Sequence, residues 1–208
     1  QRVGEAGDEG TARAVGRALG AEIAAVGFNV VFAPVLDVLF EGTTIAIGDR
    51  ALSDDPAVVA ALGRGLIHGF QDAGLACCAK HFPGHGHVTT DSHVGLPTCP
   101  LPEDALRRDH LSPFAAAVAA GVDSVMTAHV VYPAVDSSPA TLSERWIGGV
   151  LRKELGFGGV VFSDDLEMGA ITANGRVAQA AVDAIRAGVD GLLVCSRRDE
   201  VAAVVARL

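Results

Sequence analysis

Short apolar runs rich in β-branched residues alternate along the chain with longer amphipathic stretches. The short runs are almost continuously apolar, which is typical of parallel strands that are covered on both faces. They predict strands over residues 28–35, 75–80, 124–128, 160–163 and 191–195. The amphipathic stretches predict helices over residues 9–26, 56–73, 112–120, 143–154, 175–187 and 199–207. This regular alternation of strand and helix predicts an α/β fold.

Several of these helices carry start and stop signals. Asp55 stands before Pro56 and Ser112 before Pro113, and each pair matches a capping residue followed by proline at the first helical position. A glycine directly follows four of the expected helices, just before the next strand: Gly27, Gly74, Gly121 and Gly188. Glycine in such places is typical of helix C-caps, so we expect short connections between helices and strands.

Polar residues gather where four of the expected strands end. They are Asp37 after FAPVL, Lys80 and His81 after LACCA, His129 after SVMTA, and Asp164 with Asp165 after GVVFS. Contributions from the ends of several strands are typical of the C-terminal face of a barrel, whereas an open sheet concentrates its site at one switch point. We therefore predict a (β/α) TIM-type barrel. Because only five of the eight strands that such a barrel needs are visible in the sequence, we expect an incomplete barrel.

Charge and composition exclude some classes of partner. The formal net charge is −9, so the surface would repel phosphate backbones and anionic membranes, and aromatic residues for base stacking are only 5%. No apolar run of about 18 residues predicts a membrane-spanning helix. We expect no nucleic-acid and no membrane partner, and the sequence predicts no oligomeric state.

The four cysteines form no CxxC pair: Cys77, Cys78, Cys99 and Cys195. This pattern predicts buried free thiols rather than a structural zinc site or a disulfide framework. Free thiols are typical of a reducing compartment, so we expect a cytoplasmic location, with any export signal lying before Gln1.

The segment KHFPGHGHVTTDSHVGLP, residues 80–97, contains four of the seven histidines. Its proline and glycines predict a loop that follows a strand. Asp91 and His93 are two residues apart, which places both on one side of an extended segment. A carboxylate beside an imidazole creates a proton-transfer group that works near neutral pH. The competing interpretation is a polar surface loop without a chemical role.

The segment GVVFSDDLEM, residues 159–168, carries two adjacent acids at the end of an expected strand. Alternation places Asp164 on the face of Phe162 and Asp165 on the opposite face, so only one carboxylate can point at a pocket. The other role open to such a pair is the N-cap of a following helical turn. We expect both roles, one for each residue.

Five blocks follow one another across nearly the whole chain: FAPVLDV, IGDR followed by DP, KHFPGHG with DSH and LP after it, VMTAHVVYPAVD, and VFSDDLEM. In these blocks the chain resembles the family-3 glycoside hydrolases, and within them the β-N-acetylhexosaminidase, or β-N-acetylglucosaminidase, branch. The resemblance implies that residues 1–208 are a single segment of a barrel catalytic domain, which lacks the first βα units and the last strand of the family's barrel. It also implies hydrolysis of terminal β-linked N-acetylglucosamine from carbohydrates such as peptidoglycan fragments, with retained configuration and no cofactor or metal.

The resemblance also assigns the catalytic residues. Asp164 matches the nucleophile that forms a covalent glycosyl-aspartate, and His93, oriented by Asp91, matches the general acid/base. Five residues are implied to bind or border the sugar: Lys80, His81, Arg50, His129 and Met168. We expect Asp37 to act only by holding Lys80 or Arg50 in place.

Other interpretations stay open at this point. A metal-dependent hydrolase would take its ligands from the histidine-rich loop: His81, His85, His87, Asp91 and His93. An inactive sugar-binding remnant would follow from the missing βα units, which in the family include a DQEGG-like segment. A substrate-assisted mechanism would need Asp164 and Asp165 as an orienting pair, which the alternation disfavours.

Overall fold

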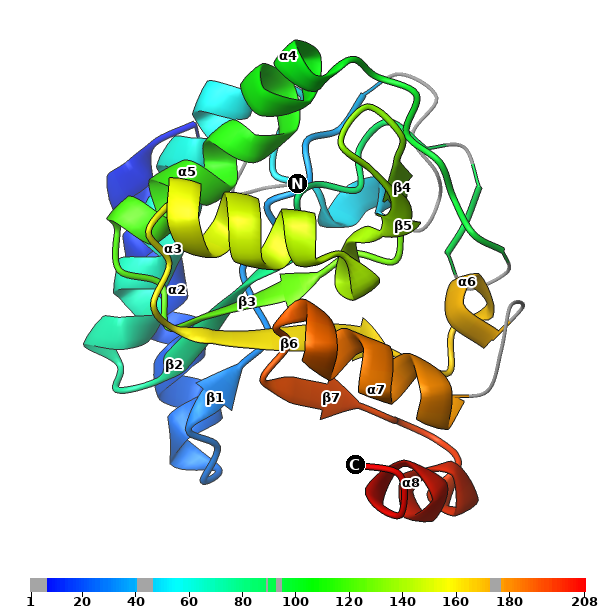
Figure 1. Cartoon of the computed structure of the whole chain (residues 1–208). Helices are drawn as coiled ribbons and strands as arrows, with labels where there is room; N and C mark the ends of the chain where they lie inside the picture. The colour runs from blue at the N-terminus through cyan, green and yellow to red at the C-terminus, as the bar shows by residue number, and fades with distance from the viewer. Residues whose placement is uncertain (1–6, 41–46, 89, 93–94, 173–176) are drawn as a thin grey trace.

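The computed structural model describes residues 7–40, 47–88, 90–92, 95–172 and 177–208. Five parallel strands form one curled sheet in the order β1-β2-β3-β6-β7 (Figure 1). They are β1 Val30–Val31, β2 Ala76–Phe82, β3 Ser124–Thr127, β6 Val160–Asp165 and β7 Gly191–Leu193. The spatial order follows the chain order without the reversal of an open doubly wound sheet. The predicted incomplete (β/α) TIM-type barrel is therefore confirmed.

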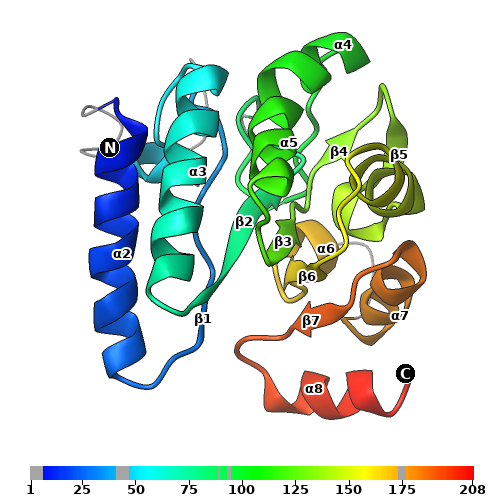
Figure 2. The ribbon, with the colours of Figure 1, turned by 90° about the vertical axis from the view of Figure 1, so that its left-hand side faces the viewer.

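Helices lie along the outside of this sheet, and Figure 2 shows α2, α3 and α5 side by side. The longer ones are α2 Glu9–Ala25, α3 Pro56–Asp72, α5 Ser112–Ala119, η4 Arg145–Glu154, α7 Val177–Ala187 and α8 Arg198–Val205. The short ones are η1 Gly48–Arg50, α4 Glu103–Ala105, η2 Leu106–Leu111, η3 Ala140–Leu142 and α6 Gly169–Thr172. Within the described part of the chain, every helix is too short or too polar to span a bilayer.

Most of the predicted caps are confirmed. Asp55 Oδ1 accepts a hydrogen bond from the Ala57 N–H at 2.8 Å, which caps α3. The four glycines that were expected after helices all have positive φ, between 77° and 108°. The expected cap at Ser112 is wrong, because η2 runs directly into α5 and the Ser112 hydroxyl instead donates to the Arg108 carbonyl at 2.7 Å. The π-helical turn before Pro113 lets the helix continue past a residue without an N–H.

Two stretches differ from the predicted strands. The apolar run 28–35 forms only the two-residue strand β1 and one isolated bridge between Val35 and Lys80. Pro34 has no N–H to donate to the ladder, which explains the interruption. An unpredicted hairpin joins β4 Val131–Tyr132 to β5 Asp136–Pro139. Strand β5 consists of an aspartate, two serines and a proline, so it carries neither β-branched residues nor apolar alternation.

The main hydrophobic core lies between the sheet and its helices, and it includes Leu62 and Phe70 of α3 and Ile147 of η4. Helices α2 and α3 approach each other closely through small residues. A Cβ atom added to Gly69 would lie 2.3 Å from the Arg13 carbonyl oxygen of α2. This close contact lets α3 cover β2, the strand that delivers Lys80 and His81 to the C-terminal face.

Candidate active site

A cavity of about 120 Å³ lies at the C-terminal ends of β2 and β6. Its lining residues come from four separate stretches of the chain: Ile47, Arg50, Lys80, His81, His85, Ser92, Asp164 and Met168. Five of the eight residues that the sequence singled out therefore share one cavity. Larger hollows lie elsewhere on the molecule, such as one of about 380 Å³ beside Glu144 and Arg186, but they hold none of those eight.

Asp164 lies in the wall of this cavity with a partly exposed side chain. Its Oδ1 accepts a hydrogen bond from the Asp165 N–H at 2.8 Å, while its Oδ2 lies 4.0 Å from His81 Nε2. The Asp165 carboxylate instead accepts from the Glu167 N–H at 3.0 Å and caps the turn after β6. The two adjacent acids thus take separate positions, one facing the cavity and one holding the turn.

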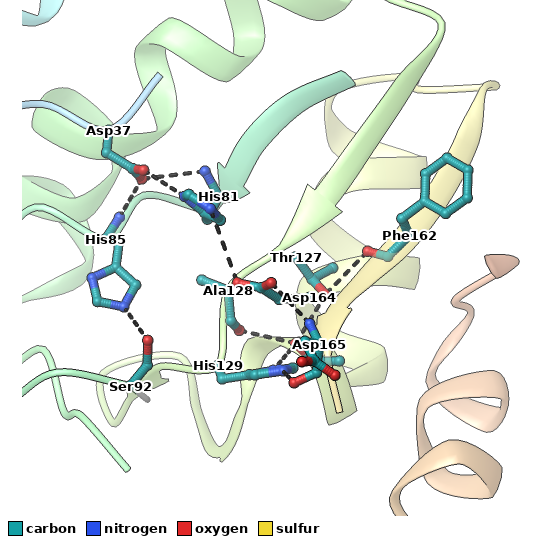
Figure 3. Close-up of polar contacts among 11 residues, drawn as sticks. Asp37, His81, His85, Ser92, Thr127, Ala128, His129, Phe162, Asp164 and Asp165 are labelled. Carbon is teal, nitrogen blue, oxygen red and sulfur yellow. Dashed lines mark hydrogen bonds and ion pairs between the residues drawn. The ribbon is translucent and has the colours of Figure 1, made fainter. Parts of the chain in front are cut away.

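Asp37 is fully buried behind His81 (Figure 3). Its Oδ2 lies 2.7 Å from His81 Nδ1, and its Oδ1 accepts from the backbone N–H groups of His85 at 2.7 Å and His81 at 3.3 Å. Burial acts to raise the pKa of Asp37, but the neighbouring His81 and His85 outweigh it, so the pKa is lowered. We expected Asp37 to hold Lys80 or Arg50; its carboxylate instead binds His81 and the start of the loop that follows β2.

Two cations line the same cavity as Asp164. Lys80 is the last but two residue of β2, and Arg50 is the last residue of η1. Burial lowers the pKa of Lys80, while the nearby Asp164 acts in the opposite direction. Met168 closes the wall beyond β6, and its N–H donates to the Asp165 carbonyl at 3.1 Å. The cavity therefore combines one carboxylate with two positive side chains and an apolar patch.

His85 and Ser92 also line the cavity, although the sequence motifs indicated no role for Ser92 and placed His85 only among possible metal ligands. His85 Nε2 lies 3.1 Å from Ser92 Oγ, and the Ser92 carbonyl accepts from the Ala170 N–H at 3.0 Å. These contacts hold Ser92 from two sides. Asp91, next to it, is partly exposed, and the expected acid/base His93 lies outside the described residues.

His129 is buried behind the strand ends and is not among the residues that line the cavity. Its Nδ1 lies 2.8 Å from Thr141 Oγ1, and its Nε2 lies 2.9 Å from the Asp165 carbonyl oxygen (Figure 3). The sequence implied that His129 borders the sugar, but the structure shows both ring nitrogens bonded to protein atoms. Thr141, which no sequence motif indicated, is its partner.

The metal-hydrolase interpretation receives no support from the described ranges. Among those residues, no group of three or more His, Cys, Asp or Glu side chains is placed to hold a metal ion. His87, one of the candidate ligands, pairs with His110, and their Nδ1 and Nε2 atoms lie 2.8 Å apart.

The family model described as Glycosyl hydrolase family 3 N terminal domain matches residues 2–208. The chain belongs to this family. A relative named beta-hexosaminidase, from Aromatoleum aromaticum, is 44% identical over 189 residues, which are 91% of this chain and 53% of the relative. This family 3 chain thus spans about half the length of the curated relatives it matches.

Solved structures of related proteins have a similar fold over most of this chain. A glycoside hydrolase family 3 β-N-acetylglucosaminidase from Paenibacillus sp. str. FPU-7 has a TM-score of 0.96 and 46% identity, over 99% of this chain and 40% of that one. NagZ from Neisseria gonorrhoeae, solved with N-trifluoroacetyl-D-glucosamine, has a TM-score of 0.86 and 40% identity, over 96% of this chain and 61% of that one. The same Neisseria protein has also been solved with a zinc ion.

Proposed function

We propose that this chain is a catalytic-domain segment, over residues 1–208, of a retaining glycoside hydrolase that removes terminal β-linked N-acetylglucosamine. The substrates are oligosaccharides, with peptidoglycan fragments as the natural class, and the reaction takes place in the cytoplasm. The observation that carries the proposal is the Asp164 carboxylate in a cavity at the C-terminal end of β6 that Lys80 and Arg50 also line. Relatives named beta-hexosaminidase and β-N-acetylglucosaminidase support the choice of sugar.

Asp164 is the nucleophile in this proposal. Its Oδ1 accepts the Asp165 N–H, so Oδ2, the oxygen nearer to His81, attacks the anomeric carbon. A bond forms between Oδ2 and that carbon, the bond to the leaving oxygen breaks, and the product of this step is a glycosyl ester. A fixed carboxylate on one face of the sugar is what a retaining mechanism requires.

The sugar ring is held by the residues around Asp164. The Lys80 ammonium and the Arg50 guanidinium donate hydrogen bonds to ring hydroxyls, and His81 Nε2 forms a further hydrogen bond from a ring whose orientation Asp37 fixes. Burial leaves the Lys80 ammonium poorly solvated, which lowers its pKa. A hydrogen bond to a substrate hydroxyl therefore stabilises this ammonium more than it would a solvated one.

His93 supplies the proton to the leaving oxygen, and Asp91 orients its imidazole. In the second step water attacks the anomeric carbon and gives its proton to His93, the bond to Oδ2 breaks, and Asp164 is a carboxylate again. This assignment rests on the DSH motif, since His93 lies outside the described residues. The neighbouring Ser92 lines the cavity and is held there by His85 and by Ala170.

Hydrolysis of 4-nitrophenyl N-acetyl-β-D-glucosaminide by this chain tests the proposal. Asp164→Asn should lower kcat by about 10³-fold or more, because it removes the attacking carboxylate without changing side-chain volume. Asp72→Asn at the C-terminal end of α3 is the matched control, since its carboxylate lies outside the cavity and forms hydrogen bonds only to Arg13 in the described contacts. An active Asp164→Asn variant would contradict the assignment.

Two further results would favour the competing interpretations. Loss of activity in a chelator with recovery in zinc would support a metal-dependent hydrolase. Binding of N-acetylglucosamine without any turnover would support a sugar-binding remnant.

A further inference from the structure

A buried polar network surrounds the strand segment that carries Asp164. The Asp165 carbonyl on one side of it lies 2.9 Å from His129 Nε2, and the Phe162 carbonyl on the other side lies 3.3 Å from Thr127 Oγ1. Thr141 joins the two ends, with its Oγ1 2.8 Å from His129 Nδ1 and 2.9 Å from Thr127 Oγ1. One continuous set of side chains therefore binds the backbone of β6 before and after the nucleophile.

Regular strand pairing does not hold this segment. The ladder between β3 and β6 ends at the pair of Met126 and Phe162. On the other edge, the register between β6 and β7 shifts between Phe162 and Asp165. Asp164 thus lies where neither neighbouring strand pairs with it in register, although the next residue, Asp165, pairs with Leu193 of β7. The network from β3, the segment after it and η3 binds this backbone from the other side.

The acceptor beside Nε2 determines which nitrogen of the His129 ring carries the proton. The Asp165 carbonyl can only accept, so we assign the ring proton of His129 to Nε2. Burial lowers the pKa of His129, although nearby Asp164 opposes the shift, so the ring is neutral and Nδ1 is an acceptor. The single proton of the Thr141 hydroxyl then goes to Nδ1 at 2.8 Å rather than to the Ala128 carbonyl at 3.1 Å. Both nitrogens of His129 are used in this way, which leaves none for a sugar hydroxyl.

We propose that His129 is the positioning residue of the nucleophile. Its Nε2–H fixes the Asp165 backbone through the carbonyl, and the Asp165 N–H in turn fixes Asp164 Oδ1 at 2.8 Å. This chain of two hydrogen bonds sets which carboxylate oxygen faces the anomeric carbon. The inference rests on the proposed function in one respect only, namely that Asp164 is the attacking group.

Two substitutions at one position separate this role from a general packing role. His129→Gln carries an amide N–H at about the place of Nε2 and keeps the bond to the Asp165 carbonyl. His129→Asn reaches only as far as Nδ1, so it keeps a partner for Thr141 and loses the bond to Asp165. We expect His129→Asn to lower kcat about 10- to 100-fold with little change in KM, and His129→Gln to stay within about 5-fold of the unsubstituted chain.

Amide hydrogen exchange at Asp165 provides a readout that needs no turnover. His129→Asn should accelerate it by about 10-fold or more, whereas His129→Gln and the control His68→Asn on α3 should leave it nearly unchanged. If His129→Asn does not fold, Thr141→Val replaces it: without the Thr141 hydroxyl the His129 ring can turn away from the Asp165 carbonyl, so exchange at Asp165 should accelerate and kcat should fall at unchanged KM.

Equal losses of kcat in the Gln and Asn variants would overturn the proposal, as would unchanged exchange at Asp165 in His129→Asn. A chain without any turnover would instead refute the proposed function, and the exchange measurement would still decide whether His129 holds the Asp165 backbone.

Discussion

Replacement of Asp37 by asparagine tests how the buried carboxylate prepares the cavity. Asp37 is fully buried and accepts three N–H groups, one from the His81 ring and two from the backbone of His81 and His85. The Asp37→Asn side chain would keep the volume and one acceptor oxygen. It would place an NH₂ group against His81 Nδ1, which lies 2.7 Å from the native carboxylate, or turn and lose the two backbone contacts.

The expected loss follows from the bond that is removed. A hydrogen bond to a charged group contributes about 1.5–3 kcal/mol, so kcat/KM should fall by about 10- to 150-fold if His81 binds the sugar. Because Asp37 is buried, the fold should also lose about 1–3 kcal/mol of stability. The lowered pKa of Asp37 means that the carboxylate stabilises the fold at neutral pH, and that this contribution disappears as pH falls through the lowered pKa.

The assay is kcat/KM for 4-nitrophenyl N-acetyl-β-D-glucosaminide, with unfolding in urea measured at pH 7 and at lower pH. Asp72→Asn is again the matched control, since it removes a carboxylate from a partly exposed ion pair with Arg13. If Asp37→Asn keeps the unsubstituted kcat/KM, then Asp37 does not prepare His81 for the sugar, whatever the change in stability.

Three other predictions concern the buried His110, glycines in two helices, and the proposed acid/base His93. Burial and the neighbouring His87 lower the pKa of His110 from 6.5 to about 4. The free energy of unfolding should therefore fall by up to about 3 kcal/mol as the pH drops from 6.5 to 4, and unfolding in urea should show a smaller fall in His110→Gln. Gly69→Ala should destabilise the fold by about 1–3 kcal/mol, because its Cβ would meet the Arg13 carbonyl. Gly148→Ala in η4 is the matched control: its Cβ would meet only Glu144 Cγ at 3.5 Å, so it should be neutral or stabilising by about 0.5–1 kcal/mol. His93→Ala should lose less rate with a nitrophenolate leaving group than with a sugar, and azide should restore turnover; equal losses without rescue would assign His93 a positioning role.

Much of the barrel could be predicted from the sequence because its elements have strong local patterns. The apolar runs that became β2, β3 and β6 are nearly uninterrupted, and Asp55 before Pro56 marks the start of α3. The β4–β5 hairpin was missed because its second strand is polar. The helix through Ser112 was cut at the wrong residue, because a serine before a proline is as compatible with a π-helical turn as with an N-cap.

Part of the candidate site could also be predicted from the sequence. The motifs on β2 and β6 predict that Lys80, His81 and Asp164 lie close together, since the C-terminal ends of parallel strands meet at one face, and the three residues do line one cavity. The partners that hold these residues have no motif of their own. Thr141 binds His129 from 12 residues away, and Asp37 binds His81 from 44 residues away. Single hydrogen bonds of this kind are set by tertiary packing, which periodicity and spacing do not report.

Covalent trapping would identify the nucleophile without relying on the loss of activity in a variant. The chain is incubated with a 5-fluoro N-acetylglucosaminyl fluoride, which slows hydrolysis of the glycosyl ester, and the labelled peptide is identified by mass spectrometry. A glycosyl-aspartate mechanism predicts one adduct, located on Asp164, and none in Asp164→Asn. An adduct on Asp165 or elsewhere, or release of an oxazoline without any adduct, would contradict it.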